Sequence, residues 1–247
     1  MHSIRFLASR RWALLALTVV VLAWVAWALG QWQFHRLEDR QDRNVIVERN
    51  TSAAPVPVED VMAVGRPVSR EDEWRQVTAT GTYATDQTVV VRYRTRQGQS
   101  GVDLVVPLMT DDGPALLVDR GWMMADNRGR LEDVPEPART PVTVTGWVRA
   151  DATGDSTLVT ERSTRAISSV AIGEALDLEV YGGFVDLVSE APEVGAELAP
   201  AEPPELNDGP HFFYGLQWWF FGALALFGFG YLAYDEWRKA REGAPAA

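Results

Sequence analysis

The chain has 247 residues, contains no cysteine and carries a formal net charge of −11 at neutral pH. The absence of cysteine excludes disulfide bonds, thiolate metal sites and cysteine nucleophiles. Residues 1–31 carry a charge of +3 and residues 211–247 are neutral, so residues 32–210 hold −14, a charge that repels phosphate and excludes nucleic acid as a partner.

The N-terminal part predicts a membrane-spanning helix. Residues 1–11 form a basic head, and the apolar run Trp12–Gly30 that follows has 19 residues, enough for about 28 Å of helix. The uncharged stretch continues to Phe34, so we predict a transmembrane helix over residues 12–34. A cleavable signal peptide is the alternative, because Ala26–Ala28 resembles a cleavage site. The length of the run and its tryptophans favour a retained helix, and the arginines of the head place the N-terminus in the cytoplasm.

Residues 35–210 predict one extracytoplasmic domain built mainly from β-strands. Six runs rich in β-branched residues are bounded by turn residues: Trp74–Tyr83, Thr88–Arg94, Val102–Met109, Ala115–Arg120, Val142–Val148 and Phe184–Val188. They lie too close together for helical crossovers, so we expect a largely antiparallel sheet, either a small sandwich or an open barrel. Asp111–Pro114 predicts a hairpin turn, and Ser169–Leu176 predicts one short helix. The acidic, proline-rich segment Ser189–Glu205 predicts a flexible tether.

A second transmembrane helix is predicted over residues 211–234. No residue from Phe212 to Tyr234 carries a formal charge, which gives a helix about 35 Å long. Asn207–Pro210 supplies capping side chains and a proline suited to a first helical position. The basic residues of the tail, residues 235–247, place the C-terminus in the cytoplasm. The predicted fold is an α+β membrane protein, in which two transmembrane helices flank one extracytoplasmic β domain.

Histidine occurs only at His2, His35 and His211, and none of these positions lies between the first and the last predicted strand. This inventory excludes a Ser-His-Asp triad or a histidine–zinc site in the β domain. Paired carboxylates remain possible by number, but no spacing singles out a pair, so enzyme chemistry is poorly supported.

The ends of the two predicted helices carry a group of residues that suits haem. In a helix that begins at His211, residues three and four apart are neighbours, so one stripe joins the residues His211, Tyr214 and Trp218, with Gln217 beside it. Trp32 and Arg36 end the first helix at the same membrane boundary. An imidazole ligates haem iron, aromatic rings form a flat apolar wall and an arginine pairs with a carboxylate. An aromatic belt with a helix-capping histidine is the alternative.

Several short segments resemble the surfeit locus protein 1 family. In chain order they are Leu29–Arg36 (LGQWQFHR), Thr80–Tyr83, Arg92–Thr95, Gly98–Gly101, Val105–Leu108, Leu117–Trp122, Gly146–Arg149, Tyr181–Asp186 and the helix start His211-x-x-Tyr214-x-x-Gln217-Trp218. The sequence departs from the family pattern in two places. The basic residue usual after Arg36 is Arg40 at best, and the asparagine usual just before the histidine is four residues away, at Asn207.

The resemblance implies an assembly factor for haem-copper cytochrome c oxidase in a bacterial cell membrane, and not an enzyme. It implies haem a as the cofactor, bound stably or in transit, with His211 as the iron ligand. The expected partners are the catalytic subunit of the oxidase, haem a synthase and membrane lipid. Two alternatives stay open: a permanent accessory subunit of the oxidase or of a respiratory supercomplex without its own haem, and a two-span sensor or adaptor whose β domain binds an extracytoplasmic ligand.

Overall fold

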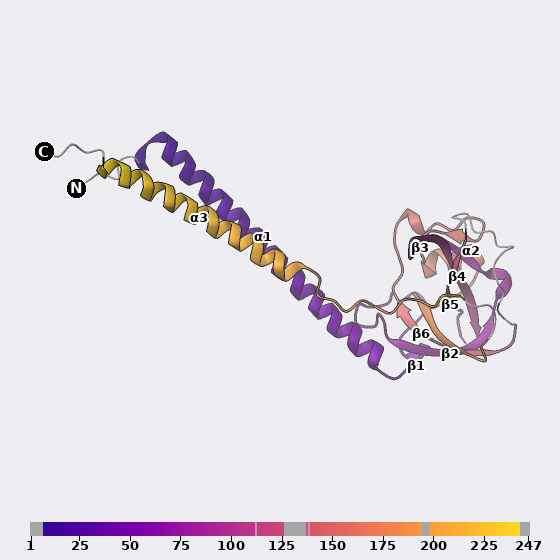
Figure 1. The fold of residues 1–247 in the computed structure, drawn as a ribbon. Helices are drawn as coiled ribbons and strands as arrows, with labels where there is room; N and C mark the ends of the chain where they lie inside the picture. Colours follow the sequence, from indigo (N-terminus) through magenta and orange to yellow (C-terminus); the bar gives the residue numbers. More distant parts are fainter. Residues whose placement is uncertain (1–6, 112, 126–136, 138, 194–197, 243–247) are drawn as a thin grey trace. The chain divides into compact units, whose positions relative to one another are not determined.

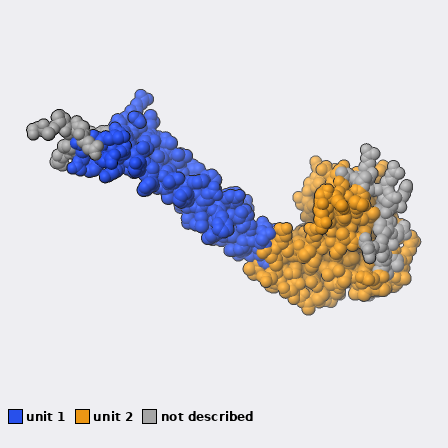
Figure 2. Space-filling model, in the orientation of Figure 1, with its two compact units in different colours: residues 1–44, 207–247 blue, residues 45–206 orange. Residues whose placement is uncertain are grey.

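The computed structural model describes residues 7–111, 113–125, 137, 139–193 and 198–242. The chain divides into two compact units, one formed by residues 1–44 with 207–247 and the other by residues 45–206 (Figure 2). The first unit is made of long helix and the second contains all the β-strands that the structure describes.

Two helices, α1 (Arg10–Ser52) and α3 (His211–Glu242), run antiparallel in the first unit, to which α1 contributes its residues up to Asn44 (Figure 1). Both are long and apolar enough to cross a membrane. Small residues form their interface, because Ala26 of α1 and Gly222 of α3 are buried and face each other. A Cβ built on Gly222 would lie 3.2 Å from the Cβ of Ala26. The two backbones therefore approach closely, as in membrane helix pairs with small residues at the contact.

Helix α1 extends well beyond the uncharged stretch. The sequence prediction placed the end of the first helix at Phe34, whereas α1 continues to Ser52. Residues 31–54 contain neither glycine nor proline and are rich in good helix formers, and Pro55 follows soon after the last turn. In the second unit the final turn of α1 is fixed by Asn50, whose Nδ2 donates to the carbonyl oxygens of Glu71 at 2.7 Å and Glu73 at 2.8 Å.

The second unit contains a closed five-stranded barrel. Its strands, in order around the barrel, are β2 (Gln76–Tyr83), β6 (Val142–Arg149), β8 (Phe184–Ala191), β5 (Leu116–Met124) and β4 (Gln99–Thr110). Pairing of β2 with β4 closes the ring, and β5 with β8 is the one parallel pair in it. Short or flanking strands extend the sheet: β1 (Val56–Pro57), β3 (Val89–Arg96) and β7 (Ser163–Thr164). The described part of the unit also has short 3-10 turns at Val58–Asp60, Thr85–Gln87 and Asp155–Thr157.

The sequence prediction of a largely antiparallel β domain between two apolar helices is confirmed, and the barrel is closed where a sandwich or an open barrel was expected. Each of the six predicted runs overlaps a strand. The predicted helix is confirmed as α2 (Ser169–Leu176), where the Oγ of Ser168 accepts a hydrogen bond from the amide of Ala171. Asp177 ends this helix in the left-handed conformation.

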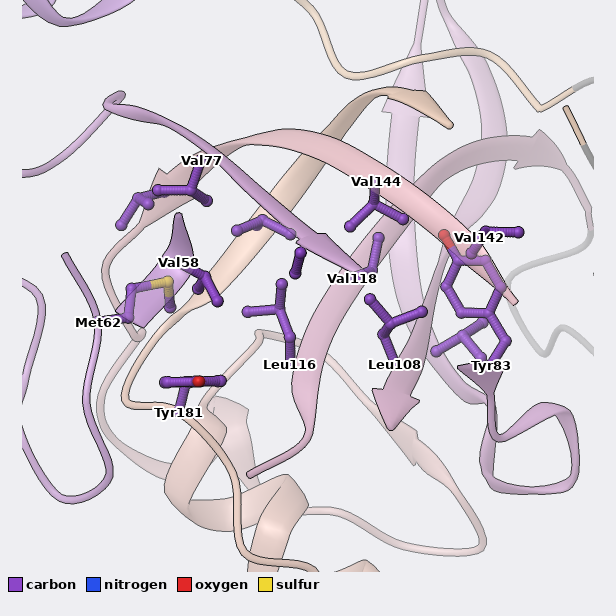
Figure 3. Close-up of a cluster of buried hydrophobic side chains, with 14 residues drawn as sticks. Val58, Met62, Val77, Tyr83, Leu108, Leu116, Val118, Val142, Val144 and Tyr181 are labelled. Atoms are coloured by element: carbon purple, nitrogen blue, oxygen red, sulfur yellow. The ribbon is translucent and has the colours of Figure 1, made fainter. Parts of the chain in front are cut away.

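The main hydrophobic core is formed by residues that alternate along the barrel strands (Figure 3). On β2 they are Val77, Ala79 and Tyr83, and their neighbours include Val144 of β6 and Val118 of β5. A second cluster packs on α2 through Ile172 and contains Val89, Val91, Val105, Leu117, Ile167 and Phe184. The helix α2 therefore covers part of the sheet formed by β3, β4 and β5.

Parts of the segment Ser189–Glu205, which its composition predicted to be a flexible tether, pair with strands of the second unit. Its first residues, Ser189–Ala191, belong to β8 and pair with β6. Ala199 exchanges two backbone hydrogen bonds of 2.8 Å with Trp122. Backbone pairing does not depend on apolar side chains, which explains why composition misled the prediction. Residues 194–197, like Asp112 in the predicted hairpin turn, lie outside the described residues.

Candidate functional site

His211, the first residue of α3, contacts α1 through its imidazole ring. Its Nδ1 lies 2.8 Å from Oε1 of Gln33, and the side chain is half-buried. Within the described part of the chain, the other ring nitrogen, Nε2, has no hydrogen-bond partner. The ring is therefore held by one nitrogen, while the second nitrogen can serve a ligand.

The turn that precedes His211 is fixed to α1 by Arg40. Arg40 donates from Nε to the carbonyl oxygen of Asn207 at 2.5 Å and from Nη2 to its Oδ1 at 2.9 Å. The same Oδ1 accepts a hydrogen bond from the amide of Gly209 at 3.1 Å. Longer bonds in the same place join Gln41 Nε2 to Asp208 Oδ2 at 3.1 Å and Asn44 Nδ2 to Asn207 O at 3.3 Å. These contacts determine where α3 begins and therefore where the imidazole lies.

The two sides of the helix pair differ in character. On one side Phe34 of α1 packs against Phe212 and Trp219 of α3, with ring centroids 6.2 Å and 4.8 Å apart. Successive residues turn by about 100° around a helix, and Gln33 and His211 face each other. This geometry places the remaining residues predicted for the site on the opposite side of the pair: Trp32 and Arg36 from α1, and Tyr214, Gln217 and Trp218 from α3. Helix geometry thus indicates that these residues share one surface of the helix pair.

This surface, which we call the Trp32–Tyr214 face, is accessible. Trp32 is 51% exposed and Tyr214 is 48% exposed. The guanidinium of Arg36 lies 5.7 Å from the ring centroid of Trp32. Its contact with Asp39 is long, at 3.9 Å, and both side chains are largely exposed, so Arg36 can exchange that partner for another carboxylate at little cost.

The structure does not bring His35 to this site. His35 is two residues beyond Gln33, so it points about 200° away from the side of α1 that meets α3. Its side chain is exposed. A site with two histidines, one from each helix, is therefore not formed within this pair.

The residues at the Trp32–Tyr214 face fit a haem in their chemistry. His211 offers a nitrogen of the type that ligates haem iron. The rings of Trp32, Tyr214 and Trp218 offer flat apolar surface, and Arg36 offers a cation for a propionate. These residues together offer one nitrogen for the iron, one apolar surface for the ring system and one positive charge for a carboxylate.

The sequence model of the SURF1 family, the surfeit locus protein 1 family, matches residues 20–223. The chain belongs to the SURF1 family. Among its curated relatives are the uncharacterized SURF1-like proteins Mb2259 of Mycobacterium bovis and Rv2235 of Mycobacterium tuberculosis. Each is 28% identical over 247 residues, covering 98% of this chain and 90% of the relative. The cytochrome oxidase assembly protein SHY1 of Saccharomyces cerevisiae is 30% identical over 101 residues, covering 40% of this chain and 25% of the yeast protein.

The SURF1-like segments of the β domain meet in buried polar contacts. Tyr83 donates from its hydroxyl to Glu190 Oε2 at 2.9 Å, and Arg120 Nη2 lies 2.8 Å from Glu190 Oε1. The Arg120 guanidinium also lies 5.1 Å from the centroid of the Tyr83 ring. Burial, and then the negative charge of Glu190, raise the pKa of Tyr83, so the phenol keeps its proton and remains a donor. These residues hold β2, β5 and β8 together.

Three buried carboxylates lie on the outer face of the barrel, from the neighbouring strands β4, β5 and β8. Asp103 pairs with Arg94 at 2.8 Å, and Asp186 pairs with Arg149 at 2.5 Å. Asp119 lies beside Asp186 in register and accepts a hydrogen bond from the amide of Gly121 at 3.0 Å. Burial raises the pKa of each of the three, and the charges of Asp103 and Asp186 raise the pKa of Asp119 further. In the part of the chain that the structure describes, no group of three or more carboxylates or histidines is arranged to bind a metal ion.

Sequence reasoning missed the residues that position His211. Gln33 lies inside the LGQWQFHR segment, but the family resemblance assigned no role to this residue. Arg40 and Asn207 counted as departures from the family pattern, whereas the structure pairs them with each other. The sequence held one indication of this contact, because Arg40 and Asn207 both lie near the same predicted membrane boundary.

Proposed function

We propose that this chain is a membrane-bound assembly factor for haem-copper cytochrome c oxidase that binds haem a and helps to install it in the catalytic subunit. Membership of the SURF1 family supports the assembly role, as does the similarity to the yeast protein named as a cytochrome oxidase assembly protein. The observation that carries the haem part is the hydrogen bond between Nδ1 of His211 and Gln33, together with an Nε2 that has no hydrogen-bond partner among the described residues.

In this proposal the residues of the helix pair divide the work of holding haem a. His211 would supply a nitrogen ligand to the iron, and Trp32, Tyr214 and Trp218 would cover the apolar surface of the haem and shield it from water. Arg36 would pair with one haem propionate, and Gln217 would offer its side-chain amide to the other propionate. The bound haem supplies the redox-active iron that the oxidase needs. Because the Trp32–Tyr214 face is exposed in the described structure, a partner can reach it without the helices separating.

The partners follow from this role. The catalytic subunit of the oxidase receives the haem, and haem a synthase is the source from which it comes. Membrane lipid surrounds the apolar parts of α1 and α3. We propose that the barrel lies outside the cytoplasm of a bacterial cell and both termini inside, because Arg10 and Arg11 at the start of α1 and the basic residues in the last turn of α3 lie at the same end of the antiparallel pair. A C-terminal fusion to a phosphatase that is active only outside the cytoplasm should stay inactive, and activity would reverse the orientation.

The test of haem binding is a visible spectrum of the protein purified from a host that makes haem a. The wild-type protein should carry a haem a spectrum, and His211→Ala should lose it while the protein still folds, because the lost hydrogen bond to Gln33 costs only about 1 kcal/mol. His35→Ala is the matched control and should keep the spectrum, since His35 points away from the site. Full haem with an unchanged spectrum in His211→Ala would contradict the assignment.

A deletion strain tests the assembly role. It should show less haem a oxidase activity, with transcription and membrane insertion of the catalytic subunit largely intact. Normal activity and normal haem a content in that strain would instead favour a sensor or adaptor. Stoichiometric copurification of a haem-free protein with the mature oxidase would favour an accessory subunit.

A further inference from the structure

The hydrogen bond between Gln33 and His211 determines which ring nitrogen carries a proton. A neutral imidazole has one nitrogen that donates and one that accepts. The atom of Gln33 that faces Nδ1 is the amide oxygen Oε1, which only accepts, at 2.8 Å. With Oε1 facing it, Nδ1 is the nitrogen that donates, and in the neutral ring the lone pair is then on Nε2.

The helix packing holds Gln33 in place for this bond. The neighbouring Phe34 packs on the other side of α1 against Phe212 and Trp219. A Cβ built on Gly215 would lie only 2.8 Å from the Phe34 ring, so this ring lies directly on the backbone of α3. The acceptor is presented by a packed part of α1 and not by a mobile side chain on a free surface.

The other edge of the imidazole faces Gly209. This glycine has a φ of +67°, in the left-handed region. A Cβ built there would lie 3.4 Å from Cδ2 and 3.6 Å from Nε2 of His211. Any side chain at this position would lie against the edge that carries the lone pair, and glycine places no side chain there. The bond from the Gly209 amide to Asn207, which Arg40 holds, keeps the turn in this conformation.

We propose that Gln33 is a positioning residue that fixes His211 as the Nδ1–H tautomer and so directs the Nε2 lone pair to the haem iron, with Gly209 keeping that edge accessible. The inference rests on the proposed function for the iron, but the tautomer itself is a property of the protein without haem. The partner of a ligating histidine normally sets both the tautomer and the orientation of the ring.

The first test uses haem-free protein labelled with ¹⁵N-histidine, at a pH of about 8. The chain has only three histidines, and the His211 signals are identified by their loss in His211→Ala. We expect the nitrogen shifts of the Nδ1–H tautomer in the wild type and a mixture of tautomers in Gln33→Leu. The Nε2–H tautomer in the wild type would overturn the proposal, whether or not the protein binds haem.

The second test measures haem a binding by titration and the midpoint potential of the bound haem. Gln33→Leu should bind about 10- to 100-fold more weakly, the usual effect of removing a partner of a metal ligand. Gln33→Glu keeps an acceptor, so it should retain binding and shift the midpoint potential to a more negative value, because an anionic partner makes the imidazole a stronger donor.

Gln31→Leu, at a nearby position of α1 without a hydrogen bond among the described residues, is the matched control and should change neither the affinity for haem a nor the midpoint potential. Unchanged affinity and potential in both Gln33 variants would overturn the proposal while leaving the haem function intact, whereas a wild type that binds no haem would defeat the proposed function itself.

The role of Gly209 has its own pair of variants. Gly209→Asn can keep the left-handed backbone but adds a side chain against Nε2, so it should lose haem binding and retain the Nδ1–H signal. Gly65→Asn is the control, because Gly65 has a nearly equal φ of +66° and no atom within 4 Å of an added Cβ. Full haem binding by Gly209→Asn would show that this edge is not the one that meets the iron.

Discussion

Arg40 and Asn207 are 167 residues apart in the chain, and two hydrogen bonds from one guanidinium join them. One bond reaches the backbone oxygen of Asn207 and the other its side-chain oxygen, so the arginine fixes both the position and the orientation of this residue. The side-chain oxygen then accepts from the amide of Gly209. Through this chain of contacts, α1 determines the conformation of the turn that presents His211.

Arg40→Gln should loosen this turn without unfolding the protein. A hydrogen bond to a charged group is worth about 1.5–3 kcal/mol, and partial exposure reduces that value to about 1 kcal/mol here. We therefore expect the amides of residues 208, 209 and 211 to exchange their hydrogens about fivefold to tenfold faster, measured by hydrogen exchange in detergent.

Arg43→Gln is the control for this change. Arg43 lies one turn further along α1, is exposed and has no hydrogen bond or ion pair within the described residues. Its substitution should leave the exchange of the turn unchanged. Equal effects from the two arginines would mean that net charge, and not the contact with Asn207, stabilises the turn.

The local structure of the barrel could be predicted because the signals for it are local. Runs of β-branched residues mark the strands, and Ser168 and Asp177 bound α2 where the sequence predicted its ends. The closure of the barrel could not be predicted, since it depends on the pairing of β2 with β4 and on the parallel pairing of β5 with β8, which no turn signal specifies.

The sequence proposes residues for the candidate site, but it does not specify how they are arranged. His211 and Trp32 were identifiable because a histidine and aromatic residues at a membrane boundary are distinctive. Their arrangement depends on the register between α1 and α3, which is determined by contacts such as Ala26 with Gly222. The end of α1 was predicted too early because a loss of hydropathy marks the end of a membrane span and not the end of a helix.

Asp119→Asn should raise the melting temperature at pH 7. Burial and two neighbouring carboxylates raise the pKa of Asp119 above its value in the unfolded chain. The folded state therefore holds this proton more tightly, and the free energy of unfolding falls as the pH rises from the unfolded pKa, about 3.9, to the folded pKa. Asparagine keeps the acceptor for Gly121 and removes the titrating group, so the melting temperature should also depend less on pH above the unfolded pKa of about 3.9.

Asp155→Asn, on an exposed turn, is the control for the Asp119 variant and should change the stability by less than about 0.5 kcal/mol. Both proteins can be followed by thermal unfolding at a series of pH values. A lower melting temperature for Asp119→Asn at pH 7 would mean that the charge of Asp119 stabilises the fold, contrary to the pKa argument.

Glu190→Ala should destabilise the barrel by about 2–4 kcal/mol, measured by chemical unfolding. The substitution removes the acceptor of both Arg120 and Tyr83, which lie in the interior where water cannot replace it. Glu193→Ala, three residues further along the same acidic segment and exposed, should change stability by no more than about 0.5 kcal/mol. Equal and small effects would restore the original prediction of a tether without packed contacts.

Ala26→Cys combined with Gly222→Cys should form a disulfide bond between α1 and α3. The Cβ positions lie 3.2 Å apart, close to the 3.5–4.5 Å that is usual for a disulfide. The natural chain has no cysteine, so every thiol that is lost on mild oxidation comes from the two introduced residues. Labelling with a maleimide before and after reduction measures that loss.

Ala26→Cys with Gly228→Cys is the control for the disulfide, because Gly228 lies about 9 Å further along α3 and has no atom within 4 Å of an added Cβ. Its two thiols should stay free, and Ala26→Cys alone will reveal any bond between two copies of the chain. Equal oxidation of both pairs would mean that the helices slide past each other. The cross-linked protein should still bind haem a, because the Trp32–Tyr214 face lies on the surface of the helix pair. If binding is lost on oxidation and returns on reduction, the haem instead binds between helices that must separate.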